Sequence, residues 1–259
     1  SFALWQGNVS ALDELSSAYF STKSEVKEKL MQGNQMRDAK DYYFGSAFYY
    51  EKELYWGLDR LPHLEDRLTE LGARNVQENK GACPIELKAP KKLDSKNKVN
   101  LYYYPSLNSP YTFVSTQRVR EMKAEYPVNL ITKPVLPMLM RSMTIPNFQA
   151  KYIISDAARE GRKHYHEMKS IYSPIGKPAR KSYSLYPIID DAGKGFEYIE
   201  ALLKASFQDG INIGNEDFLE GLVKELQLDW SVIKKDLNTQ HWKNALKSNL
   251  EDMYAGNCW

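Results

Sequence analysis

The spacing of hydrophobic positions predicts three elements in the first part of the 259-residue chain. Residues 12–30 carry leucine, tyrosine and valine at helical spacing. Aromatic-rich runs follow at 42–50 and 53–56, and because only two residues separate them they indicate a hairpin. A second amphipathic helix is expected over 59–71, where the following glycine suits a C-terminal cap. The pattern therefore predicts a helix, a hairpin and a helix within residues 1–75.

The pattern changes after a polar, basic and proline-punctuated stretch at 76–97, which we interpret as a linker. A β-rich run at 99–104 stops at a proline, and a serine and a proline then open a helix expected over 110–123. A second short strand is expected at 127–131. The order strand, helix, strand predicts a βαβ unit within residues 98–146. The two strands of such a unit are parallel, and their sheet needs cover on both faces.

From residue 147 onward the spacing of apolar residues is almost entirely helical. Helices are expected at 148–168, 194–206, 215–228, 230–237 and 240–254. We interpret 147–259 as one all-helical domain, with Asp190 and Asp191 in a solvated loop. A weak internal repeat aligns 12–30 with 219–237 without a gap, which suggests two copies of one unit, the first without its beginning and the second without its end.

Composition and charge narrow the classes of function. The chain is 42% hydrophobic and 26% charged, which is ordinary for a soluble globular protein. No apolar run approaches the roughly 18 residues of a membrane-spanning helix, and no export signal is visible at the start. A net charge of +2 gives no reason to expect nucleic acid or a membrane as partner. Cys83 and Cys258 form no CxxC motif, which argues against a disulfide scaffold and favours a cytoplasmic location.

Three segments resemble one family of proteins. Ser109, Pro110 and Tyr111 form a Ser-Pro-Tyr motif at the predicted strand-to-helix turn. This motif resembles the DsbA-like thioredoxin-fold branch that contains 2-hydroxychromene-2-carboxylate isomerases and kappa-class glutathione transferases. The stretch 133–156 is similar to the start of that family's inserted helical domain, and 53–61 is similar to its closing strand, turn and helix. The resemblance implies an α/β fold, a thioredoxin-like sheet with a large inserted all-helical subdomain.

The order of these segments differs from that of the family, in which βαβ comes first, then the helical insert, then ββα. Here the ββα-like part precedes the linker, and two arrangements stay open. In one, it pairs with the βαβ unit to complete a single thioredoxin-like sheet in circularly permuted order. In the other, the chain is an incomplete tandem repeat whose missing strands lie outside the sequence.

The chemistry implied at the motif depends on Ser109. Thiol-disulfide exchange needs two cysteines in a CxxC motif, and this chain has Ser-Pro-Tyr-Thr there, which excludes dithiol chemistry at this position. The resemblance implies instead that Ser109 donates a hydrogen bond to the sulfur of bound glutathione. Such a bond and a helix N-terminus supply roughly 2–4 kcal/mol together, whereas lowering a thiol pKa by one unit takes about 1.4 kcal/mol. Helix capping alone also explains a serine here.

The resemblance assigns further residues to a glutathione site. It implies that Asp59 contacts the γ-glutamyl ammonium group and that Tyr111 lies beside the cofactor. A shared site requires Asp59 and Ser109 to belong to one sheet, with Ser109 accessible and its strand inside a four-stranded α/β layer. Ala47 occupies the position at which the family has a cis-proline, which removes one element of the site.

Two functions remain open from the sequence. The first is a glutathione-dependent isomerase or transferase that acts on a small aromatic or electrophilic molecule, with Ser109 holding the cosubstrate thiolate. The second is a catalytically inactive thioredoxin-like module for binding or dimerisation, and the aromatic content permits a homodimer interface. His164 and His166 are two positions apart in a helical pattern, a spacing that does not suit a metal site.

Overall fold

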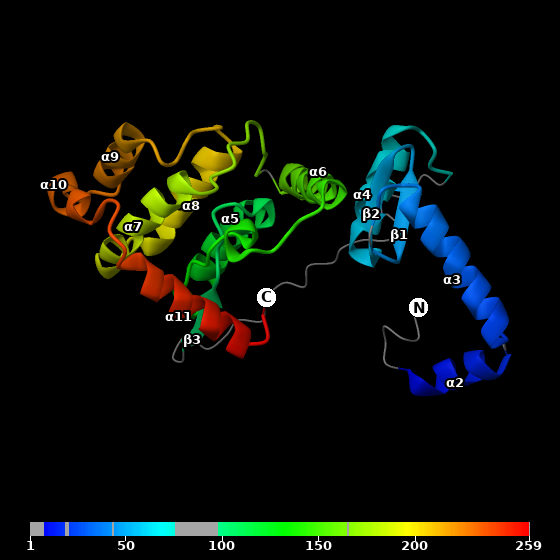
Figure 1. The fold of residues 1–259 in the computed structure, drawn as a ribbon. Helices are drawn as coiled ribbons and strands as arrows, with labels where there is room; N and C mark the ends of the chain where they lie inside the picture. Colours follow the sequence, from blue (N-terminus) through cyan, green and yellow to red (C-terminus); the bar gives the residue numbers. More distant parts are fainter. Residues whose placement is uncertain (1–7, 19–20, 43, 76–97, 165, 259) are drawn as a thin grey trace. The chain divides into compact units, whose positions relative to one another are not determined.

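The computed structural model describes most of the chain (Figure 1). The described ranges are 8–18, 21–42, 44–75, 98–164 and 166–258. The predicted linker at 76–97, with Cys83, lies outside them. The chain forms two compact units, Ser1–Arg60 and Leu61–Trp259. Each unit is described by itself.

The first unit begins with two helices where the pattern predicts one. They are α2 (Val9–Ala18) and α3 (Lys23–Asp38). The second starts at a capping box: Thr22 Oγ1 accepts the Glu25 N–H at 3.2 Å, and the Glu25 carboxylate accepts the Thr22 N–H at 2.7 Å. The capping box provides partners for the free N–H groups at the start of the second helix. The prediction of one continuous helix over 12–30 is therefore wrong. Neither helix buries a residue.

A hairpin follows, as predicted, but its first strand is shorter than the aromatic run. β1 (Ala47–Tyr50) pairs antiparallel with β2 (Glu53–Trp56), with Ala47 opposite Trp56. Glu51 and Lys52 both have positive φ, 44° and 74°, the backbone of a two-residue turn that follows the twist of the strands. The unit ends with the 3-10 turn η1 (Leu58–Arg60).

The second unit contains the predicted βαβ arrangement. It opens with α4 (Leu61–Glu70), and then β3 (Val99–Tyr103), α5 (Pro110–Glu125) and β4 (Val128–Thr132) follow. β3 and β4 are parallel and in register from Val99 opposite Val128 to Tyr103 opposite Thr132. The βαβ prediction is confirmed, with both strands close to their predicted bounds.

The rest of the second unit is helical. Its elements are η2 (Met138–Arg141), α6 (Asn147–Lys163), α7 (Lys177–Asp191), α8 (Gly195–Phe207), α9 (Glu216–Glu225), α10 (Trp230–Ile233), η3 (Lys234–Asp236) and α11 (Trp242–Ala255). α7 was not among the predicted helices, and the predicted loop at Asp190 and Asp191 is wrong because both residues end this helix.

The core of the second unit is built around α7 and α8, which lie side by side in Figure 1. Most residues of α8 are buried, and α5, α9 and α11 contribute further apolar side chains. Representative core residues from these elements are Phe113, Leu185, Leu202, Leu222 and Leu246. In the part of the chain that the structure describes, no helix is long and apolar enough to cross a membrane.

The single sheet in permuted order, one of the two arrangements that the sequence leaves open, is not shown among the described residues. β1 pairs with β2 and β3 pairs with β4, giving two separate two-stranded sheets. Each pair is joined by its own connection, a two-residue turn or the crossover helix α5, and no ladder of hydrogen bonds between the two pairs occurs in the described ranges. The condition that β3 belong to a four-stranded layer is therefore not met within these residues.

Candidate functional site

The site begins at the turn between β3 and α5. Ser109 has an extended backbone, with φ −106° and ψ 112°, and its N–H bonds to the Ser106 carbonyl at 3.1 Å. Its Oγ accepts the Thr112 N–H at 3.2 Å, and Pro110 occupies the first helical turn. The predicted N-cap is confirmed. Ser109 is half-buried, so the condition that it not be sealed in the interior is met.

Capping uses the Ser109 oxygen only as an acceptor. Among the described residues, no hydrogen bond has the Ser109 hydroxyl as donor. A serine hydroxyl carries one proton to donate and two lone pairs. The proton can therefore reach a ligand while the cap remains, and this donor lies at the positive end of a 16-residue helix.

A buried tyrosine of α7 holds the loop in front of Ser109. The Tyr183 hydroxyl accepts the Leu107 N–H at 3.3 Å and donates to the Val135 carbonyl at 2.9 Å. The Val135 N–H in turn bonds to the Pro105 carbonyl at 2.9 Å. Burial raises the pKa of the Tyr183 hydroxyl well above its usual range, which keeps it protonated as a donor. Sequence reasoning missed Tyr183 because it lies in the helix that the apolar spacing did not predict.

Tyr111, predicted to lie beside the cofactor, takes part in a contact between helices. Its hydroxyl donates to Asp156 Oδ2 at 2.8 Å, which joins α5 to α6. Asp156 is 1% exposed, and its other oxygen accepts from Arg159 at 3.2 Å. The hydroxyl proton of Tyr111 is thus already donated to Asp156.

Asp59, predicted to bind the γ-glutamyl ammonium group, lies in η1 of the first unit. Its side chain is 70% exposed and forms an ion pair with Arg60 at 2.6 Å. Ser109 belongs to the second unit, and the strands next to the two residues are in different sheets. The structure does not bring Asp59 and Ser109 into one sheet.

Cysteines and clusters of metal-ligating side chains are other features that could carry chemistry among the described residues. Cys258 is the free cysteine there, and it is exposed. No group of three metal-ligating side chains occurs in the described ranges. The predicted helix through the two histidines is too long, since α6 ends at Lys163. His166 packs instead against the Phe113 ring at 4.1 Å.

Comparisons with known proteins identify the fold. No protein family matches the sequence, and no curated protein does. Among solved structures, 2-hydroxychromene-2-carboxylate isomerase is similar with a TM-score of 0.50 and 13% identity, over 60% of this chain and 79% of that protein. A putative protein disulfide isomerase from Nitrosomonas europaea has a TM-score of 0.50 and 11% identity, over 62% and 80%. The cytosolic disulfide reductase DsbM from Pseudomonas aeruginosa, in a structure with GSH, has a TM-score of 0.47 and 10% identity, over 61% and 81%.

At these identities the likeness shows the fold alone. The first two structures support a mixed α/β, DsbA-like thioredoxin-type fold, as the Ser-Pro-Tyr motif predicts. They leave the circularly permuted order, the tandem repeat and the particular branch of the family as predictions.

Proposed function

We propose that this chain is a glutathione-dependent isomerase or transferase that acts on a small aromatic or electrophilic molecule in the cytoplasm. The observation that carries the proposal is Ser109, a half-exposed hydroxyl at the N-cap of α5, immediately after the first strand of a parallel pair. Its proton donates to no group among the described residues. A thiolate is the ligand that such a donor favours over a thiol.

The physical case rests on the charge of the thiolate. A hydrogen bond to a charged group contributes roughly 1.5–3 kcal/mol, and a helix N-terminus adds about 0.3–1 kcal/mol for a nearby anion. About 1.4 kcal/mol lowers the thiol pKa by one unit. The hydrogen bond and the helix N-terminus together would therefore bring the pKa of the glutathione thiol close to neutral. A thiolate formed in this way is the nucleophile for addition to an electrophilic carbon. Tyr111 belongs to the proposal as a further glutathione contact, and the contact of Asp59 stays a prediction from the family resemblance.

Isothermal titration with glutathione tests the serine. Ser109→Ala removes both the cap and the donor, and we expect it to weaken glutathione binding at least about tenfold. Ser109→Thr keeps both functions and should bind nearly as well as the unaltered protein. Asn215, whose side chain caps α9 through the Asp217 and Phe218 N–H groups, supplies the control.

Both cap deletions, Ser109→Ala and Asn215→Ala, should lower the free energy of unfolding by about 1 kcal/mol. Only the first should weaken glutathione binding and raise the pKa of the bound thiol, measured by thiolate absorbance. If the unaltered protein releases no heat with millimolar glutathione, the proposal is wrong. Equal affinity in Ser109→Ala would reduce the serine to a cap.

A second candidate is a catalytically inactive thioredoxin-like module for binding or dimerisation. It is favoured by the lack of a CxxC motif and by Ala47 in place of the family's cis-proline. Among the described residues the strands also form two separate two-stranded sheets. A two-stranded pair leaves unpaired backbone groups at its edges, which a second copy could pair with. Sedimentation equilibrium and the glutathione titration together distinguish the candidates. A homodimer that binds no glutathione supports the inactive module.

A further inference from the structure

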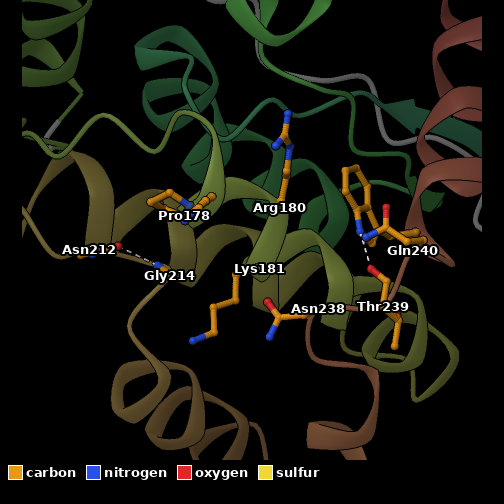
Figure 2. A pocket seen from close by; sticks show the side chains of 10 residues that line it. Pro178, Arg180, Lys181, Asn212, Gly214, Asn238, Thr239 and Gln240 are labelled. Carbon is orange, nitrogen blue, oxygen red and sulfur yellow. Dashed lines mark hydrogen bonds between the residues drawn. The ribbon is translucent and has the colours of Figure 1, made fainter.

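A pocket of about 590 Å³ lies at the start of α7 in the second unit. Its wall includes the basic side chains of Lys177, Arg180 and Lys181, and the amides of Asn212 and Gln240. Figure 2 shows Arg180 and Lys181 extending from α7 in opposite directions, with Gln240 on one side of Arg180 and Asn212 on the other. Ser109 lines neither this pocket nor its neighbour, so the site is independent of the proposed glutathione site.

A second pocket, of about 540 Å³, adjoins the first. The two share Arg180, Gln240 and Trp242 in their walls. The second is lined by four apolar side chains, Leu136, Met140, Leu246 and Leu250. Together they offer the cations at the start of α7 and four aliphatic side chains, and the two groups meet at Arg180 and Trp242.

The charge of this region is unbalanced. None of the described residues that line the two pockets is acidic, whereas Lys243 and Lys247 add two further cations to the second pocket. Lys181 is partly neutralised by Glu216 at 3.4 Å, an acid that Lys234 also contacts at 2.7 Å. Neither Lys177 nor Arg180 forms an ion pair with any described residue. They are three positions apart on one helix, so both can reach the same anion.

The walls of the pockets are held by packing. A Cβ on Gly214 would lie 2.6 Å from the Pro178 Cα, so only glycine lets the loop before α9 approach the start of α7 so closely. The Trp242 indole donates to the Thr239 carbonyl at 3.0 Å and stacks on the buried Tyr183 ring at 5.9 Å. A wall fixed in this way loses little side-chain entropy when a ligand binds.

We propose that the two pockets together bind one amphipathic organic anion. Its carboxylate or phosphate head group lies between Lys177 and Arg180, and its hydrocarbon part lies against Leu246 and Leu250. The positive end of α7, which no side chain caps, adds to the attraction. Small-molecule sites of this kind combine an apolar wall with a few polar groups that fix the orientation.

Isothermal titration with four probes tests the proposal. Decanoate and decyl phosphate carry both parts of the ligand, decanol has the chain alone, and inorganic phosphate has the charge alone. We expect both amphipathic anions to bind at least about tenfold more tightly than decanol or phosphate. The tighter of the two identifies the preferred head group. Raising the salt concentration should weaken binding of both, because these cations are exposed.

Two variants localise the binding. Arg180→Gln removes the cation shared by the two pockets and should weaken decanoate binding by about tenfold. Arg118→Gln, on the exposed surface of α5 and outside both pockets, is the matched control and should leave the affinity unchanged. Leu250→Ala removes part of the apolar wall and should weaken decanoate by about threefold or more, because it takes roughly one to three methylene contacts from the chain.

Each contrary outcome overturns the proposal. If decanol equals decanoate, the site is apolar without charge recognition. If phosphate equals decanoate, the region is only a basic surface. If Arg180→Gln and Arg118→Gln have the same effect, binding lies elsewhere. Arg180 and Arg118 are both exposed, so a folding defect is not expected in either variant, and circular dichroism checks this.

Discussion

Ser109 illustrates how far a single residue can be understood from local sequence. A serine before a proline after a β-rich run predicts an N-cap, and the cap forms with the expected bond to Thr112. Tyr183 had no such signal. Its bonds to Leu107 and Val135 join segments far apart in the chain, so they depend on the packing of α7 and not on neighbouring residues.

For Asp59 and Tyr111, the side-chain partners in the structure differ from the predicted glutathione contacts. Their types and positions fit the Ser-Pro-Tyr family, but a side chain's partner is decided by what lies near it in space. Arg60 is next to Asp59 in the chain and forms an ion pair with it, and the buried Asp156 receives the Tyr111 proton. The ion pair of Asp59 is local in the chain, whereas Asp156 is 45 positions from Tyr111 and could not be foreseen as its partner from the sequence.

At the residue scale, His166 should make stability depend on pH. Burial, with help from the charge of Lys204, lowers the pKa of His166 below its usual value of 6.5. The unfolded chain therefore binds a proton before the folded one as the pH falls. The contribution of a neutral His166 is complete above about pH 6.5 and declines as the pH drops through the folded pKa.

Chemical denaturation of His166→Gln at several pH values measures this effect. The variant should lose stability through the lost ring contact with Phe113 at pH 7.5, and this loss should shrink toward pH 5.5. His241→Gln is the control, since the His241 side chain is 82% exposed. A difference between variant and unaltered protein that does not change with pH would contradict the expected titration.

At the scale of elements, α7 explains most of what the hydrophobic pattern missed. Pro178 and Pro187 both lie in it, and prolines usually mark helix starts or breaks. Ser182 and Ser184 are fully buried where a core helix would normally carry apolar side chains. Ser182 donates to the Ile213 carbonyl at 2.9 Å, so the polar group is satisfied by a neighbouring loop that the pattern cannot reveal.

The packing of α6 against α5 and against the backbone at His166 depends on Gly161. A Cβ at this position would collide with the backbone carbonyl oxygen of His166 and lie 3.5 Å from Val114 Cγ2. The His166 N–H also bonds to the Gly161 carbonyl at 2.8 Å, so the backbone cannot simply move away. Gly161→Ala should therefore lower the free energy of unfolding by about 1–3 kcal/mol, measured by urea denaturation.

Gly221→Ala provides the matched control for this prediction. Gly221 lies inside α9, is exposed, and has no neighbouring atom within 4 Å of an added Cβ. Alanine there should raise stability by about 0.5–1 kcal/mol, because it restricts the unfolded chain and favours helix. Opposite signs for the two substitutions support the steric argument, and a stabilising Gly161→Ala would contradict it.

At the scale of the whole molecule, local arrangements were predicted better than the way the segments combine. The hairpin of β1 and β2 and the βαβ unit of β3, α5 and β4 follow from nearby residues, and both form. Whether the two would share one sheet depends on a contact between distant segments. Neither hydrophobic spacing nor turn chemistry encodes such a contact, and the described strands remain in two sheets.

The two units also differ in how their helices are held, which predicts a gradient in hydrogen exchange. Most residues of α8 are buried in the core of the second unit, whereas α3 buries none. A helix of α3's 16 residues is marginal without packing, so its amides should exchange through local opening. The amides of α8 should exchange only on global unfolding of the unit.

Hydrogen exchange followed by mass spectrometry, with the variant Thr22→Ala, tests this gradient. The variant breaks the capping box with Glu25 and removes about 1 kcal/mol from α3 alone, which should speed exchange in α3 by about fivefold. Exchange in α8 should stay the same, since the cap belongs to the other unit. Equal protection of α3 and α8 in the unaltered protein, or exchange in α8 that becomes faster in step with α3 in the variant, would show that the helices share one cooperative unit and contradict the prediction.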